Sequence, residues 1–149
     1  MGQPVRAQPL EGKRVAVVED DPIIRREVEH ALVDAGARIA RSIWNRPDAA
    51  VLDIRLGGGL TSIPIALALE MRNIPFIFYS GLEEQAIASV KARFRGSPFL
   101  SKPSRGAEIV DAIMEAIKPK PAWDRRLLHP NNRSDPYWNT PRPRRESVE

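Results

Sequence analysis

Short apolar runs that stop abruptly at polar residues are the feature that most constrains the fold of this chain. The clearest are residues 15–18, which are followed by Glu19 and Asp20, and residues 49–52, which are followed by Asp53. Short apolar runs bounded by charged or turn-forming residues are typical of buried strands. Three more strands are predicted, over residues 38–43, 75–79 and 99–100.

Helical patterns lie between these predicted strands. The first follows Asp21, which can cap a helix that has Pro22 at its first position and that Gly36 ends. Its apolar residues recur at helical spacing among charges: Ile23, Val28, Leu32 and Val33. Further helices are predicted over residues 61–72, 83–94 and 107–117, with Thr61 or Ser62 as a cap. Strands alternating with helices predict an α/β domain with a parallel five-stranded sheet.

The composition excludes several classes of function. The chain has no cysteine, which excludes disulfides, thiolate chemistry and cysteine-bound metals. No apolar run reaches the roughly 18–20 residues of a membrane helix. The N-terminus also lacks the apolar stretch of a signal peptide. We therefore expect a cytoplasmic protein that does not enter a membrane.

The two ends of the chain differ in composition from its middle. We expect an N-terminal extension over residues 1–12, a domain over residues 13–118, and a flexible Pro/Arg-rich tail over residues 119–149. The tail holds seven basic and four acidic side chains, and so carries +3 of the net charge of +4. Because the domain is then nearly neutral, nucleic-acid binding by the domain is not expected.

Polar side chains stand at the ends of four predicted strands. Besides the pair Glu19-Asp20 and the single Asp53, Ser80 follows the fourth strand and Lys102 the fifth. Parallel sheets bind ligands at the carboxyl ends of their strands, so these groups should converge on one edge. Clustered carboxylates need a compensating cation, and oxygen ligands at this density suit Mg²⁺. The set suits phosphoryl transfer, with Asp53 as the nucleophile and a cation to neutralise the phosphoryl oxygens.

Four segments that contain these residues resemble the signature segments of response-regulator receiver domains of two-component signalling: VVEDDP, AAVLDIRLGG, FIFYSG and PFLSKP. The resemblance covers about residues 13–118. It implies a stand-alone receiver with a flavodoxin-like, doubly wound fold. It also implies that a sensor histidine kinase or a histidine phosphotransfer protein donates the phosphoryl group. The output would come through protein–protein contacts rather than enzyme turnover.

The resemblance further implies a role for each site residue. Asp53 matches the phosphoacceptor, Ser80 the switch hydroxyl, and Lys102 the family's lysine, which would precede a cis peptide bond to Pro103. The implied Mg²⁺ ligands are Glu19, Asp20, Asp53 and, through its carbonyl, Arg55. Phe99 stands where the family carries its aromatic switch, and a fixed core phenylalanine is the competing interpretation.

Residues 44–48 depart from the family pattern. The family places a helix between its second and third strands, whereas this segment alone separates the predicted strands here. Five extended residues reach about 17 Å, and a return along the length of a five-residue strand already takes about that distance. This leaves no residues for a helix in the crossover between parallel strands. Three interpretations remain: a nearly straight link that leaves one face of the sheet bare, a second strand that is absent or displaced, or a partner chain that fills the gap.

A bare or partner-filled face predicts exposed apolar surface near Ile43 and Trp44. Our hypothesis is that this face mediates homodimerisation or partner docking; the simpler alternative is that Trp44 folds over the gap. The missing helix also leaves a second function open, a degenerate receiver that acts as a phosphorylation-independent interaction module. A hydrolase with an aspartyl-phosphate intermediate ranks last, because the acid–base aspartate that it needs is replaced by Arg55.

Overall fold

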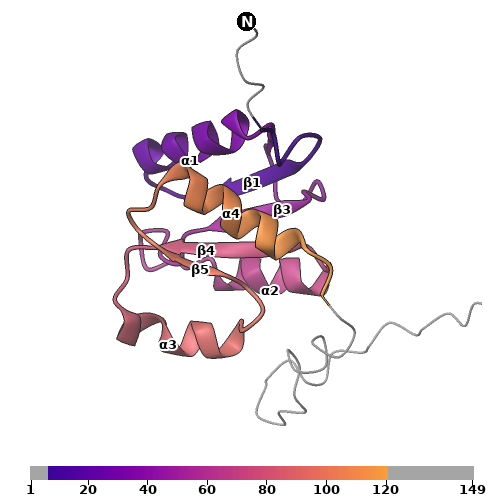
Figure 1. Cartoon of the computed structure of the whole chain (residues 1–149). Helices are drawn as coiled ribbons and strands as arrows, with labels where there is room; N and C mark the ends of the chain where they lie inside the picture. Colours follow the sequence, from indigo (N-terminus) through magenta and orange to yellow (C-terminus); the bar gives the residue numbers. More distant parts are fainter. Residues whose placement is uncertain (1–6, 121–149) are drawn as a thin grey trace, which may run out of the picture. The chain divides into compact units, whose positions relative to one another are not determined.

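The computed structural model describes residues 7–120 of the chain. They contain a parallel five-stranded sheet with the strand order β2-β1-β3-β4-β5 (Figure 1). The strands are β1 (Arg14–Val18), β2 (Arg38–Ala40), β3 (Ala49–Leu52), β4 (Phe76–Ser80) and β5 (Phe99–Ser101). This order confirms the predicted flavodoxin-like sheet. Apart from Pro119 and Lys120, the predicted tail over residues 119–149 lies outside the described residues.

Helices cover both faces of the sheet (Figure 1). They are α1 (Pro22–Asp34), α2 (Ile63–Met71), α3 (Glu84–Arg93) and α4 (Gly106–Ile117). Because successive strand residues point to opposite faces, Val15 and Val17 pack with α1 and α4, whereas Ala16 and Val18 pack with α2 and α3. No helix within residues 7–120 is long and apolar enough to cross a membrane.

Helix α1 begins as its sequence predicts. The Asp21 carboxylate accepts hydrogen bonds from the backbone N–H groups of Ile23 and Ile24, at 2.9 and 3.2 Å. Its buried stripe is narrower than the apolar spacing suggests, because Val28 and Leu32 are buried whereas Ile23 and Val33 are exposed. For α2, Ser62 is the N-cap residue, but its buried hydroxyl has no hydrogen-bond partner among the described residues. The hydroxyl of the other predicted cap, Thr61, accepts from the Ile63 N–H at 3.4 Å.

Part of the predicted N-terminal extension contributes to the core. Leu10 is almost completely buried in the cluster under α1 and α4, and its N–H donates to the Ala35 carbonyl at 2.9 Å. Gly36, with φ +96°, makes this packing possible, because a Cβ there would lie 3.0 Å from the Gln8 Cβ and the Glu11 nitrogen. The ordered packing therefore begins before residue 13.

The link between β2 and β3 contains no helix, and the strand register explains how it crosses. Strand β2 ends at Ala40, which pairs with Ala16, and β3 begins at Ala49, which pairs with Val15. The chain therefore retreats by only one residue along the sheet while it moves across two strand spacings, about 10 Å. Residues 41–48 easily span that distance. The second strand is present and in register, so the interpretation that it is absent or displaced is wrong; the predicted strand over 38–43 was too long.

Candidate functional site

The carboxyl edge of the sheet brings three acidic side chains together. Glu19 and Asp20 follow β1 and Asp53 follows β3, and each offers a carboxylate oxygen within 4.8 Å of the others. The hydrogen bond from the Asp53 N–H to the Val18 carbonyl, at 2.9 Å, extends the pairing of β1 with β3 up to the site. The convergence predicted from the strand ends is therefore observed.

Lys102 joins this cluster from β5, two strands away from Asp53 in the sheet order. Its ammonium donates to Glu19 Oε2 and, at 3.0 Å, to Asp53 Oδ2. All three side chains are largely buried, with 16% of Lys102, 4% of Glu19 and 11% of Asp53 exposed. The peptide bond from Lys102 to Pro103 is cis, as the resemblance implies.

The charges of this cluster are unevenly compensated. Burial raises the pKa of the Glu19 carboxyl above its ordinary value, and its hydrogen bond to Lys102 offsets only part of that effect. Burial lowers the pKa of Lys102, but the hydrogen bonds to Glu19 and Asp53 outweigh it, so the net pKa lies above the ordinary value. The raised pKa of Glu19 therefore follows mainly from burial, and the raised pKa of Lys102 from its two carboxylate partners. The site is thus short of positive charge, which favours a further cation.

Ser80 stands at the same edge, at the end of β4. Its position follows from the register, in which Phe78 pairs with Leu52, the residue before Asp53. Ser80 is buried, and its hydroxyl oxygen accepts a hydrogen bond from the Leu82 N–H at 3.1 Å. Because a hydroxyl that accepts in this way still has its own hydrogen, Ser80 can donate to an oxygen placed beside Asp53.

Gly57 shapes the site in a way that the sequence analysis missed. A Cβ at this position would lie 2.9 Å from Asp20 Oδ2, and Gly57 has a φ of +76°. Glycine therefore lets the loop after Asp53 approach the Asp20 carboxylate without a clash. By sequence alone, the glycine triplet at residues 57–59 indicates only a loop, and what distinguishes Gly57 is its distance to the Asp20 carboxylate.

The backbone of Arg55 is free to face the cluster. Arg55 and Thr61 form an antiparallel bridge, through hydrogen bonds from the N–H groups of Leu56 and Ser62 to the carbonyls of Leu60 and Ile54. Arg55 and Thr61 are thus a non-hydrogen-bonded pair, in which the N–H and C=O groups of both residues point away from the partner strand. The Arg55 carbonyl is therefore not used by the bridge, which is what the predicted metal ligand requires.

Solved structures with the same fold include several receiver proteins. The solution structure of SdrG from Sphingomonas melonis is 31% identical, with a TM-score of 0.57, over 71% of this chain and 97% of that one. A response regulator receiver protein from Sinorhizobium medicae is 25% identical, with a TM-score of 0.61, over 72% and 96% of the two chains. The response regulator PhyR from Brucella abortus shares the fold at 22% identity, with a TM-score of 0.58, over 74% of this chain and 50% of that one.

The chain belongs to the response-regulator receiver family. No protein-family model matches its sequence, and no curated protein does. The family is therefore carried by the fold and by the residues at the carboxyl edge of the sheet.

Phe99 of this receiver contacts both an aromatic ring and a lysine ammonium. Its ring centroid lies 4.8 Å from that of Phe78, and the Lys91 ammonium lies 5.5 Å from the ring. The ring is half-buried and belongs to the core on the side of α2 and α3. This packing is consistent with a core phenylalanine, while its partial exposure leaves the switch interpretation as a prediction.

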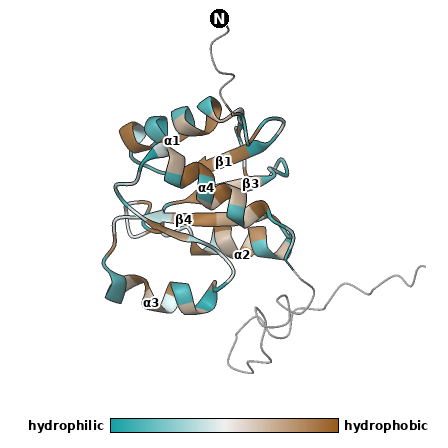
Figure 2. Ribbon diagram, in the orientation of Figure 1, coloured by the Kyte–Doolittle hydropathy of each residue, from teal (hydrophilic) through white to brown (hydrophobic). Residues whose placement is uncertain are grey.

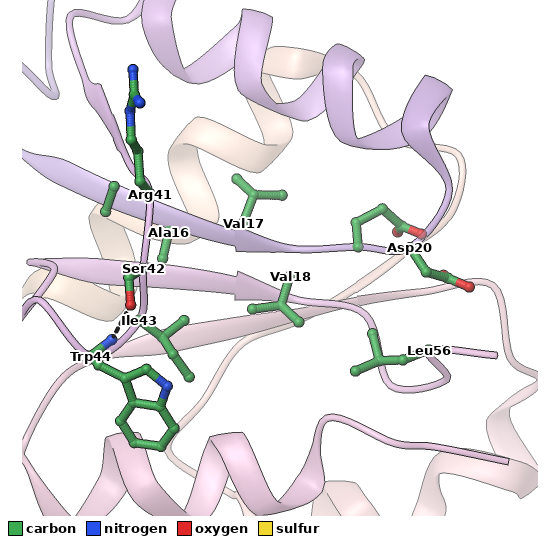
Figure 3. A pocket seen from close by; sticks show the side chains of 11 residues that line it. Ala16, Val17, Val18, Asp20, Arg41, Ser42, Ile43, Trp44 and Leu56 are labelled. Atoms are coloured by element: carbon green, nitrogen blue, oxygen red, sulfur yellow. Dashed lines mark hydrogen bonds between the residues drawn. The ribbon is translucent and has the colours of Figure 1, made fainter. Parts of the chain in front are cut away.

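A groove lies where the receiver family carries the helix that is missing here. It has a volume of about 400 Å³ and runs from Trp44 and Ile43, in the link, to Asp20 and Leu56 beside the acidic cluster (Figure 3). Ile43 packs against the core, whereas Trp44 is 59% exposed and its ring contacts the Arg72 guanidinium at 5.2 Å. Ile43 rather than Trp44 therefore covers part of the gap, and the apolar surface predicted at this face is present.

Proposed function

We propose that this receiver accepts a phosphoryl group on Asp53, with Mg²⁺ as cofactor, and signals through protein–protein contacts. The observation that carries the proposal is the Lys102 ammonium, which binds both Glu19 and Asp53 beside a third carboxylate. A structural ion pair needs one cation and one anion. Three gathered carboxylates, a buried hydroxyl and a lysine are instead the groups that phosphoryl transfer requires.

The donor set fits Mg²⁺. Asp20, Asp53 and the Arg55 carbonyl would hold the ion, and Glu19 would orient it from the buried side. Hard oxygen ligands suit this cation, which keeps several waters when few protein groups bind it. The bound ion would neutralise charge on the phosphoryl oxygens and on the attacking carboxylate.

The side chains of this chain have distinct roles in the proposed transfer. A carboxylate oxygen of Asp53 attacks the phosphorus, and the bond from phosphorus to the donor's histidine nitrogen breaks, which leaves an aspartyl phosphate. Lys102 moves its hydrogen bond from the Asp53 carboxylate to a phosphoryl oxygen. Ser80 donates its hydroxyl hydrogen to another phosphoryl oxygen and so couples the modification to the end of β4.

The proposal also names partners. The donor is a sensor histidine kinase or a histidine phosphotransfer protein in the cytoplasm, and the receiver assists its own phosphorylation and dephosphorylation without acting as a turnover enzyme. These assignments rest on membership of the receiver family.

Intact mass after incubation with acetyl phosphate and Mg²⁺ tests the proposal. Wild type should gain one phosphoryl group, Asp53→Asn should gain none, and Asp111→Asn, an exposed aspartate on α4, should behave like wild type. An adduct that persists in Asp53→Asn would place the acceptor elsewhere.

A second candidate function is favoured by the groove, namely an interaction module that works without phosphorylation. Folded wild-type protein that gains no phosphoryl group in the presence of Mg²⁺ would select this function. The same sample, scored for binding to a candidate partner with and without acetyl phosphate, then shows whether the output depends on Asp53.

A further inference from the structure

Helix α2 is apolar around almost its whole circumference, yet much of it is not buried. Its sequence, IPIALALEM, has Glu70 as its sole charged residue, and Figure 2 shows its hydrophobic colouring. Ala66 and Leu69 are buried, Ile63, Ile65 and Leu67 are partly buried against the core, and Pro64 and Met71 are exposed. A helix that is hydrophobic on all sides is normally enclosed by protein, so the outer side of α2 lacks a covering partner within residues 7–120.

The exposed residues Leu60, Pro64 and Met71, with the partly buried Leu67 between them, form an apolar stripe that we call the α2 seam. Pro64, Leu67 and Met71 are three and four residues apart and therefore share one side of the helix, and Leu60 lies just before its first turn. Leu60 is 68% exposed and Met71 is 76% exposed. Trp44, which contacts Arg72 at the end of α2, extends this apolar surface towards the groove.

Each chain has both an open groove and an apolar seam, so the two surfaces of one copy can pack against those of a second copy. The groove lacks a helix, and the seam belongs to a helix that lacks a cover. A nine-residue helix is about 14 Å long, and a five-residue strand such as β1, which lines the groove, is about 17 Å long. The seam itself carries no charge, so two copies can approach through it without repulsion.

The charges at the two ends of this surface select the orientation. The groove runs from Trp44 to Asp20, which lies on the carboxyl edge of the sheet (Figure 3). At the Trp44 end, the exposed Arg72 donates to the Trp44 carbonyl, and the exposed Arg46 follows Trp44 by two residues. Parallel pairing of two α2 helices would bring the two basic ends together. Antiparallel pairing brings the Arg72 end of each copy to the Asp20 end of the other, twice over, as a two-fold axis requires.

We propose that the receiver forms a homodimer in which the α2 seams of two copies pack antiparallel and each copy covers the groove of the other. This surface goes beyond the proposed phosphoacceptor function, because the seam contains no residue of the phosphoryl site and the groove meets that site only at Glu19 and Asp20. The face that the missing helix would occupy then becomes an interface.

Sedimentation velocity of the full chain over a wide concentration range tests the dimer. We expect a monomer–dimer equilibrium that Met71→Glu weakens by roughly tenfold or more, because the substitution places a charge on an apolar residue of the interface. Ile23→Glu is the matched control, because Ile23 is 70% exposed on α1, away from the seam. A monomer at all concentrations, or equal effects of the two substitutions, overturns the proposal.

Cross-linking tests the orientation, and the absence of cysteine makes single-cysteine variants clean. Leu60→Cys and Met71→Cys are mixed in equal amounts and treated with a short bis-maleimide. Antiparallel packing predicts that the mixed product exceeds either product of like variants. An excess of the product that joins two Met71→Cys chains would indicate parallel packing. Cross-linking yields no higher than those of Ile23→Cys would indicate that there is no specific interface. Either result overturns the proposal.

Discussion

The carboxyl edge of the sheet and the link between β2 and β3 lie close together, yet they differ in how far they follow the receiver pattern. At the carboxyl edge, side chains from the ends of β1, β3, β4 and β5 gather as the resemblance to receivers predicts. In the link, residues 41–48 cross the sheet without the family's helix. The comparison shows that the site depends on strand ends, and β2, beside the missing helix, contributes no site residue. The scaffold can therefore change at that face while the side chains at the carboxyl edge keep their positions.

Removal of the Lys102 side chain should have the largest effect on the rate of phosphorylation. Lys102→Ala should slow phosphorylation by acetyl phosphate by roughly 10²–10³-fold, because no other side chain is seen to bind both Glu19 and Asp53 among residues 7–120. Rates from intact mass, with Lys118→Ala as an exposed control, measure this. Near-normal rates in Lys102→Ala would mean that the carboxyl edge is not built for phosphoryl transfer.

Substitutions of Gly57 and Gly58 distinguish an effect on the geometry of the ion site from an effect of backbone strain. Gly57→Ala should weaken Mg²⁺ binding about tenfold, because its Cβ would approach Asp20 Oδ2 at 2.9 Å. Gly58→Ala carries similar backbone strain, with φ +58°, but its Cβ meets nothing within 4 Å. Calorimetric titration with Mg²⁺ should therefore distinguish the two variants; equal affinities would show that the loop after Asp53 does not shape the ion site.

The link should contribute to stability but not to chemistry. Asp48 holds its end, since its carboxylate accepts from the Arg14 N–H and its own N–H donates to the Arg14 carbonyl, both at 2.8 Å. Asp48→Ala should lower the free energy of unfolding by about 0.5–1.5 kcal/mol in urea titrations. The phosphorylation rate should be unchanged. A large loss of rate would show that the link and the site are coupled.

The smallest expected effect is a pH dependence of Mg²⁺ affinity. Because burial raises the pKa of Glu19, the folded protein holds this proton to higher pH than the unfolded chain does, and metal-free stability falls as the pH rises from the ordinary pKa through the raised one. Mg²⁺ needs the carboxylate, so its affinity should change in the opposite sense and decline several-fold as the pH falls through the raised pKa.

Glu19→Gln removes this group while keeping its shape. Affinities measured by calorimetry across the same pH range should show a flatter profile in the variant than in wild type. An unchanged slope would assign the proton to another group.

Much of the site could be predicted because it depends on local pattern. A buried strand that ends in a polar residue delivers that residue to the carboxyl edge, and the parallel topology does the rest, so Glu19, Asp20, Asp53, Ser80 and Lys102 all stand at that edge. Gly57 was missed because its importance is a distance to Asp20, which no spacing along the chain encodes. Leu10 was missed because one leucine in a polar segment has no period.

The succession of strands and helices along the chain could be predicted from the sequence, because it follows from hydrophobic period and strand termination. The parallel sheet and the residues at its carboxyl edge follow from that succession. Only the tertiary structure decided how residues 41–48 cross the sheet, because the distance depends on the pairing of Ala40 with Ala16 and of Ala49 with Val15. It also decided that Pro64 and Met71 of the apolar helix α2 remain exposed. An apolar sequence shows that a helix can be buried, but which of its sides meets other atoms depends on the packing of segments distant in the chain.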